Sequence, residues 1–313
     1  MLQLIIGTAG TGKSVFIKEK IQQNARSGKK SILIVPEQFS KTGEAEIFSA
    51  LEKSQFGLVN VFSFTSLLRD VWAESGKAPI QLLTDAGKAV VAKKSLQNVQ
   101  KQLNSYGNQK HNIGFAFELA HVFEDFKRNG IDSTALYDIA QRAPEINGKL
   151  KDVSHIYSEY CANIKSGGAD LEEVYLDLSR TLPVSYTDST DFFVDGFESF
   201  TYGQYAILSR IMEKSDDVYI TLTAEDVFDR WGGTHPLSYT AQTAAQLISY
   251  AKKVGVQVLK PIKLETQHRF ANTVLCNIDK FLLSKPIEEC AEGADRQHGT
   301  DNACVTVFST QFD

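Results

Sequence analysis

The stretch Gly7–Ile21, GTAGTGKSVFIKEKI, is the strongest indicator of fold in this 313-residue chain. Gly7, Gly12, Lys13 and Ser14 match the pattern G-x-x-x-x-G-K-[S/T] in full. The apolar run LQLII precedes the pattern, and SVFIKEKIQQNAR, a segment with helical spacing, follows it. Strand, glycine-rich loop and helix in this order predict a phosphate-binding loop, because loop amides and a helix N-terminus attract phosphate.

We predict that this loop binds ATP with Mg²⁺. In such a loop the lysine, Lys13, reaches the β and γ phosphates, and the hydroxyl of Ser14 ligates the metal. A glycine-rich turn that matches by chance is the alternative, and the strand and helix on either side argue against it. The predicted nucleotide-binding residues of the loop are Gly7, Thr8, Ala9, Gly10, Thr11, Gly12, Lys13 and Ser14.

Further apolar runs predict the rest of a parallel sheet. SILIVP, LVNVFSF, DFFVDGF and DVYITLT have the composition of strands buried on both faces, and ACVTVFS predicts a last strand near the C-terminus. Between residues 79 and 168 the pattern changes to helical spacing with few β-branched runs. The predicted fold class is therefore α/β, a P-loop parallel sheet with an inserted all-helical subdomain.

Composition restricts the compartment and the partners. The formal net charge of −5 argues against a surface coated in positive charge, so any contact with nucleic acid would come from a local patch or from a partner. The four cysteines include no CxxC pair, which predicts neither a zinc site nor a disulfide framework. The chain starts without a basic leader or a long apolar run, so we expect no signal peptide, no membrane span and a cytoplasmic location.

Hydrolysis of ATP requires a second element. A carboxylate at the end of a neighbouring strand holds the metal through water, and an adjacent acid usually orients the attacking water. The segment FFVDGFESF supplies Asp195 as a metal ligand beside Ser14, but Gly196 stands where the adjacent acid is expected. Glu198 is the remaining candidate for the catalytic acid, which is otherwise unknown. An ordinary Asp-Gly turn at a strand end is the alternative for Asp195.

The order of motifs resembles that of superfamily 1 DNA helicases of the UvrD type. More closely, it resembles the N-terminal part of the AddB/RexB subunit of the bacterial ATP-dependent helicase/nuclease, over essentially the whole chain. The likeness rests on GTAGTGKS, ILIVPEQFS, VFSFTSLLRDVW, DLEEVYLDL, FFVDGFESFT, VYITLT and LETQHRF, and VPEQFS and VDGF point to that branch. The resemblance implies a RecA-like domain in two parts, 1–78 and 169–265, a helical insertion at 79–168, and the truncated start of a second helicase-like domain at 266–313.

The resemblance also implies contacts with DNA and nucleotide. Pro36–Ser40 would occupy the place where helicases grip single-stranded DNA, with Phe39 stacking on a base and Ser40 contacting a phosphate. Phe64 has a similar position, and packing under the sheet is the alternative for both phenylalanines. Arg269 matches the arginine that contacts the γ-phosphate in active helicases. A solvated residue at the start of a helix is the alternative for Arg269.

Departures from the family pattern set limits on the activity. Active relatives carry a glutamine-bearing segment ahead of the loop, whereas only five residues precede Ile6, so we expect weak base selectivity. Active relatives also have Asp-Glu where this chain has Asp195-Gly196, which predicts slow or absent hydrolysis. AddB/RexB proteins are several times longer and end in a nuclease domain, with an iron–sulfur cluster in the AddB branch. We therefore expect a fragment, and we assign no nuclease or cluster function to these residues.

The first functional hypothesis is an ATP-binding, helicase-like and motor-inactive portion of the AddB/RexB-type component of a heterodimeric ATP-dependent DNA helicase/exonuclease. The resemblance implies action in double-strand break repair, homologous recombination and Chi recognition, with an AddA/RexA-type subunit and single- and double-stranded DNA as partners and no membrane. An interaction scaffold with a vestigial loop is one alternative. A P-loop small-molecule kinase is another, against which the insertion offers only Arg128 and Arg142 for a second phosphate group.

Overall fold

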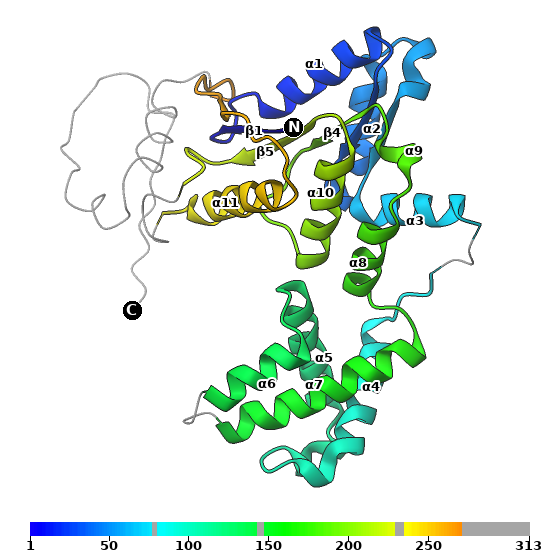
Figure 1. Cartoon of the computed structure of the whole chain (residues 1–313), viewed down its shortest axis with the longest axis vertical. Coiled ribbons are helices and arrows are strands. Elements are labelled where there is room, and N and C mark those ends of the chain that lie inside the picture. The colour runs from blue at the N-terminus through cyan, green and yellow to red at the C-terminus, as the bar shows by residue number, and fades with distance from the viewer. Residues whose placement is uncertain (77–79, 143–146, 229–234, 271–313) are drawn as a thin grey trace, which may run out of the picture.

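The computed structural model describes residues 1–76, 80–142, 147–228 and 235–270, and a parallel sheet forms their centre. Six strands of these residues pair in the order β3-β2-β4-β5-β1-β6, and every pairing is parallel (Figure 1). The predicted α/β fold with a parallel sheet is thereby confirmed. The predicted strand ACVTVFS lies outside the described residues. The strands are β1 (Leu2–Gly7), β2 (Lys30–Ile34), β3 (Val59–Phe62), β4 (Thr190–Val194), β5 (Val218–Thr223) and β6 (Ile262–Lys263).

Helices cover both faces of the sheet, which explains the unbroken apolar runs of its strands. In β1, Leu4 and Ile6 belong to one core, and Ile5 between them belongs to the core on the opposite face. Phe192 and Phe193 of β4 divide in the same way. The helices that pack with the sheet are α1 (Lys13–Arg26), α2 (Ser40–Ser49), α3 (Phe64–Glu74), α8 (Leu171–Thr181), α9 (Val184–Thr187), α10 (Tyr202–Lys214) and α11 (Ser238–Lys253). Of these, α1 and α2 cover the face that buries Ile5.

Among the described residues, four further helices stand between β3 and β4 in the sequence and have a core of their own. Figure 1 shows them together at one end of the molecule, away from the sheet. Phe123 occupies the centre of this core, with its ring centroid 5.0 Å from those of both Tyr157 and Tyr160. The four helices are α4 (Asp85–Val99), α5 (Ile113–Arg128), α6 (Ser133–Arg142) and α7 (Asn147–Gly167).

The chain enters and leaves this helical unit through adjacent residues. The backbone N–H of Leu83 donates to the carbonyl of Ala169 at 3.1 Å, and the N–H of Ala169 donates to the carbonyl of Gln81 at 3.2 Å. Beside this crossing, the ammonium of Lys127 at the end of α5 lies 3.3 Å from Asp170 and 2.9 Å from Glu173. These contacts hold α5 to the start of α8. The domain boundaries at 79, 169 and 266 stay predictions.

Several elements differ from the sequence pattern. Residues of LVNVFSF form a strand only as far as Phe62, because Ser63 ends it and caps α3. The Ser63 hydroxyl accepts a hydrogen bond from the backbone N–H of Ser66 at 3.0 Å, and the Ser66 hydroxyl accepts from the N–H of Ser63 at 2.7 Å. Helices α2, α3 and α8 were not predicted as helices. In the described ranges, every helix is too short or too polar to cross a membrane.

Candidate phosphate-binding site

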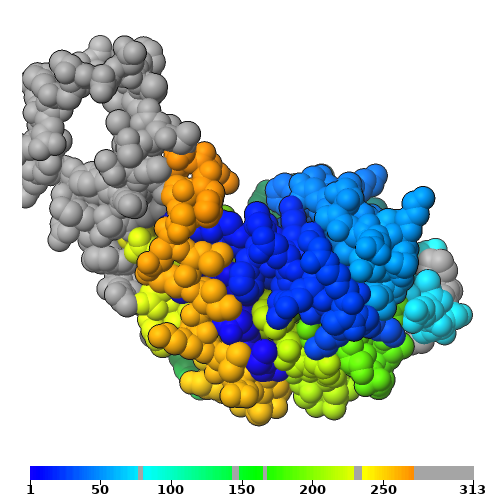
Figure 2. Space-filling model, turned by 90° about the horizontal axis from the view of Figure 1, so that it is seen from above, coloured from blue at the N-terminus to red at the C-terminus, as the bar shows by residue number. Residues whose placement is uncertain are grey.

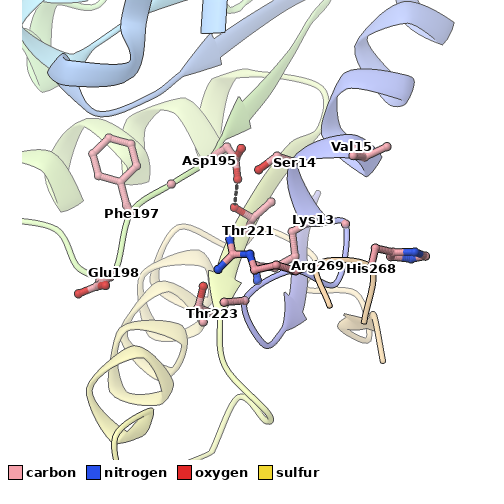
Figure 3. A pocket seen from close by; sticks show the side chains of 14 residues that line it. Lys13, Ser14, Val15, Asp195, Phe197, Glu198, Thr221, Thr223, His268 and Arg269 are labelled. Carbon is pink, nitrogen blue, oxygen red and sulfur yellow. Dashed lines mark hydrogen bonds between the residues drawn. The ribbon is translucent and has the colours of Figure 1, made fainter. Parts of the chain in front are cut away.

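The loop between β1 and α1 borders a cavity of about 520 Å³ (Figure 3). Segments that are far apart in the sequence meet here, because the carboxyl ends of parallel strands share one edge of the sheet. The structure thus brings Asp195 and Arg269 to the loop that contains Lys13 and Ser14. The cavity is lined by Ala9, Gly10, Gly12, Lys13, Ser14, Val15, Asp195, Gly196, Phe197, Glu198, Thr221, Thr223, His268 and Arg269.

The Lys13 side chain is folded into the loop. Its ammonium donates hydrogen bonds to the carbonyls of Gly7 and Thr8, each at 2.8 Å. Burial lowers the pKa of Lys13 to about 8, an effect that Asp195 opposes and Arg269 reinforces. Charge-assisted hydrogen bonds to phosphate are stronger than those to neutral carbonyls. The loop therefore holds a partly desolvated ammonium group, which can exchange its bonds to the carbonyls of Gly7 and Thr8 for bonds to an anionic ligand.

Asp195 and Ser14 form the oxygen-rich side of the cavity. Asp195 follows β4, and its side chain faces the Ser14 hydroxyl (Figure 3). Strand β5 lies between β4 and β1, and from it the hydroxyl of Thr221 donates a hydrogen bond to Asp195 Oδ1. Thr221 could not be predicted from the sequence, because its contact with Asp195 depends on the order of the strands in the sheet. One hydroxyl and one carboxylate suit Mg²⁺, which takes its other ligands from water and phosphates.

Gly196 has a backbone conformation that favours glycine. Its φ is +83°, and an added Cβ would lie 3.3 Å from Cδ of Pro36. The loop after Asp195 is therefore shaped around a residue without a side chain. Glu198 is exposed at the rim, and its carboxylate points away from Lys13 and Asp195 in Figure 3. The structure does not bring Glu198 into the position of the adjacent acid.

Arg269 reaches the cavity because the chain after β6 runs along the loop. The backbone N–H of Leu264 donates to the carbonyl of Ile6 at 2.8 Å, and the N–H of His268 donates to the carbonyl of Gly10 at 2.9 Å. His268 and Arg269 both line the cavity. Arg269 was expected from the family resemblance, whereas His268 was not, since no local pattern marks a contact across so many residues.

The three residues predicted to contact DNA differ in exposure. Phe39 ends the short helical turn Glu37–Phe39 and is 52% exposed. The Ser40 hydroxyl donates to the carbonyl of Glu37 at 3.0 Å. Phe64 is 3% exposed and packs edge-on to Phe197 at a centroid distance of 5.5 Å, which is the packing role left open as its alternative. A contact of Phe39, Ser40 or Phe64 with DNA stays a prediction.

Across the described ranges, no group of three or more histidine, cysteine, aspartate or glutamate side chains is arranged to hold a metal ion. A magnesium ion held by Ser14, Asp195 and nucleotide phosphates needs no such cluster. The donor set of the cavity therefore fits a metal that arrives with a nucleotide.

Comparison with known proteins gives one family. The family model described as "ADDB, N-terminal" matches residues 4–279. Similar curated proteins are named as the B subunits of an ATP-dependent helicase/deoxyribonuclease. That of Caldanaerobacter subterraneus subsp. tengcongensis is 29% identical over 92% of the chain, that of Clostridioides difficile 27% over 85%, and that of Clostridium perfringens 28% over 92%. The chain spans only about a quarter of the length of these relatives, 26%, 24% and 26% respectively.

Proposed function

The chain belongs to the AddB N-terminal family, and we propose that it binds ATP with Mg²⁺ and hydrolyses it slowly or not at all. One observation carries the proposal. A single cavity holds Lys13, Ser14, Asp195 and Arg269, while Gly196 stands at the position of the adjacent acid. The first four residues are the groups that binding requires, and the missing side chain is the group that efficient hydrolysis requires.

Each residue has a defined task in this proposal. Lys13 exchanges the carbonyls of Gly7 and Thr8 for the β and γ phosphates. Ser14 and Asp195 hold Mg²⁺, and the hydrogen bond from Thr221 orients the carboxylate. Mg²⁺ held by Ser14 and Asp195 would supply positive charge that offsets the charge of the phosphates.

The proposed weakness of hydrolysis follows from the carboxylates of the cavity. Among its lining residues only Asp195 and Glu198 carry a carboxylate. Asp195 is assigned to the metal, and Glu198 points away from it (Figure 3). A water molecule at the γ-phosphate would therefore lack a second carboxylate among the residues that line this cavity to position it, and positioning of that water is a main component of catalysis in such enzymes.

The task of the chain within a larger protein is also a proposal, since the chain covers a quarter of its relatives. We propose that it is part of an AddB/RexB-type protein that pairs with an AddA/RexA-type subunit and acts on single- and double-stranded DNA in double-strand break repair, recombination and Chi recognition. The exposed ring of Phe39, beside the nucleotide cavity, would contact the single strand. A cytoplasmic location stays a prediction.

Nucleotide titration tests the proposal. The melting temperature of the chain should rise with ATP·Mg²⁺, because a ligand at 100 times its Kd stabilises a fold by about 2.7 kcal/mol. Lys13→Ala and Asp195→Asn should abolish the rise, and Lys94→Ala, at an exposed position in α4, should leave it unchanged. No rise at millimolar ATP·Mg²⁺ would favour the scaffold alternative. Turnover at the rate of an active helicase, lost in Lys13→Ala, would contradict slow hydrolysis.

A further inference from the structure

The Gln267 side chain bridges the phosphate-binding loop and the backbone of Arg269. Its amide nitrogen Nε2 donates to the carbonyl of Ala9 at 2.7 Å, and its Oε1 accepts a hydrogen bond from the backbone N–H of Arg269 at 2.8 Å. Figure 2 shows the segment that ends at residue 270, in orange, lying along the N-terminal residues in blue. The Gln267 side chain therefore contacts both the phosphate-binding loop and Arg269, the two parts of the site that a nucleotide would meet.

Gly10 shows how close this approach is. A Cβ added at Gly10 would lie 2.1 Å from Oε1 of Gln267 and 2.6 Å from Cβ of Arg269. The pattern G-x-x-x-x-G-K-[S/T] leaves this position free, so the pattern alone does not demand a glycine here. Gly10 also has a φ of +88°, a conformation that favours glycine. A glycine at this position therefore allows the loop to turn and leaves space for Gln267 and Arg269.

The hydrogen bonds from Gln267 and His268 lie on the carbonyl side of the loop, opposite the amide side that would bind a phosphate. A loop that offers its amide N–H groups to an anion turns carbonyls away from it. The carbonyls of Ala9 and Gly10 accept from Gln267 and from the backbone of His268. These bonds can persist while the loop holds a phosphate, so Gln267 does not compete with the ligand.

We propose that Gln267 is a positioning residue that couples the shape of the phosphate-binding loop to the placement of Arg269. This inference rests on the proposed binding of ATP and on the contact of Arg269 with the γ-phosphate. When the Gln267 amide is lost, the backbone of Arg269 loses its link through Gln267 to Ala9, and of these bonds to the loop only the one from His268 to Gly10 remains. Recognition of the third phosphate then weakens, while binding of the first two phosphates by Lys13 persists. Coupling between two sites is reciprocal. A bound γ-phosphate therefore also stabilises the contacts of Gln267 and His268 with the loop.

The discriminating measurement is the ratio of affinities for a non-hydrolysable ATP analogue and for ADP, both with Mg²⁺. Arg269→Ala should lower this ratio about tenfold, the size expected for one hydrogen bond to a charged group. Gln267→Met should lower it by a similar factor, with the ADP affinity changed less than about twofold. The double variant should lose no more than either single variant, because both remove the same interaction. Gln246→Met, at an exposed position on α11, is the matched control and should keep the ratio of the parent chain.

Gln267→Glu separates the two bonds. Its carboxylate can still accept from the N–H of Arg269 but cannot donate to the carbonyl of Ala9. We expect the ratio to fall as it does in Gln267→Met, and a parental ratio in Gln267→Glu would overturn the coupling to the loop. If Arg269→Ala lowers the ratio and Gln267→Met does not, the inference alone is overturned. If the parent chain binds neither nucleotide, the proposed function has failed and the inference with it.

Discussion

Replacement of Gly196 tests whether the site is built around a missing side chain. A residue other than glycine in the left-handed region costs about 1–2 kcal/mol, and the φ of Gly196 is +83°. The added Cβ would also meet Cδ of Pro36 at 3.3 Å, a tight contact that the ring can relieve by a small shift. We therefore expect Gly196→Ala to lower the free energy of unfolding by about 1–2 kcal/mol, measured by urea denaturation.

Two other glycines separate the causes. Gly255 has a φ of +73° with open space around its missing Cβ, so Gly255→Ala should show the backbone cost alone. Gly57 has open space and no positive φ, and Gly57→Ala should change stability by no more than about 0.5 kcal/mol. A stability of Gly196→Ala equal to that of Gly57→Ala would refute the argument from backbone conformation.

The same position bears on catalysis. Gly196→Glu restores the acid of active helicases but places it on a strained backbone next to Asp195. We expect its turnover to exceed that of the parent chain by no more than about tenfold, or about 1.4 kcal/mol in the barrier. A Gly196→Glu variant that is as stable as the parent and hydrolyses ATP like an active helicase would show that the side chain alone was missing.

Three further predictions concern charge and exposure. Burial lowers the pKa of Lys13 to about 8, and a bound phosphate would raise it, so binding of ATP should take up a proton above pH 8. The ATP affinity measured by titration should therefore be constant below pH 8 and should fall above it by up to about tenfold per pH unit. Lys127→Met leaves the buried Asp170 and its neighbour Glu173 without their cation and should cost about 3 kcal/mol in urea denaturation, whereas Lys214→Met, at an exposed pair, should cost under about 0.5 kcal/mol. Phe39→Ala should weaken binding of oligo(dT) about tenfold and Phe56→Ala, also exposed, should not; equal losses in both variants would contradict a specific stacking role for Phe39.

The sequence predicted those parts of the fold that depend on local order. The loop from Gly7 to Ser14 is recognisable because its spacing and its flanking elements are contiguous. The helix at Tyr202–Lys214 also has a local start signal, since Thr201 and Gln204 form a capping box at its start. The strand before Ser63 was predicted too long, because Phe64 continues the apolar run of the strand as the first residue of a helix.

The parts that could not be predicted depend on contacts between distant residues. Thr221 reaches Asp195 only because β5 lies between β4 and β1, an order that no single segment encodes. Gln267 meets Ala9 across 258 positions of sequence. The Asp-Gly pair at 195–196 was visible, but its two interpretations, a turn and a degenerate site, are not exclusive. The structure shows a positive φ at Gly196 and a carboxylate aimed into the cavity at Asp195.

The bonds between Gln81, Leu83 and Ala169 place the two ends of the helical unit side by side. The bridge at Leu82 and Ala169 is parallel, so the chain runs in the same direction before and after its long excursion. The segments at Leu82 and Ala169 are one interstrand spacing apart, about 4.8 Å, and one or two glycine residues can span this distance. A chain in which Gly-Gly joins Gln81 directly to Ala169 should therefore keep the sheet and its cavity, with nucleotide titration as the measurement. In such a chain the sheet would keep its connectivity, because the two ends of the excursion already lie side by side.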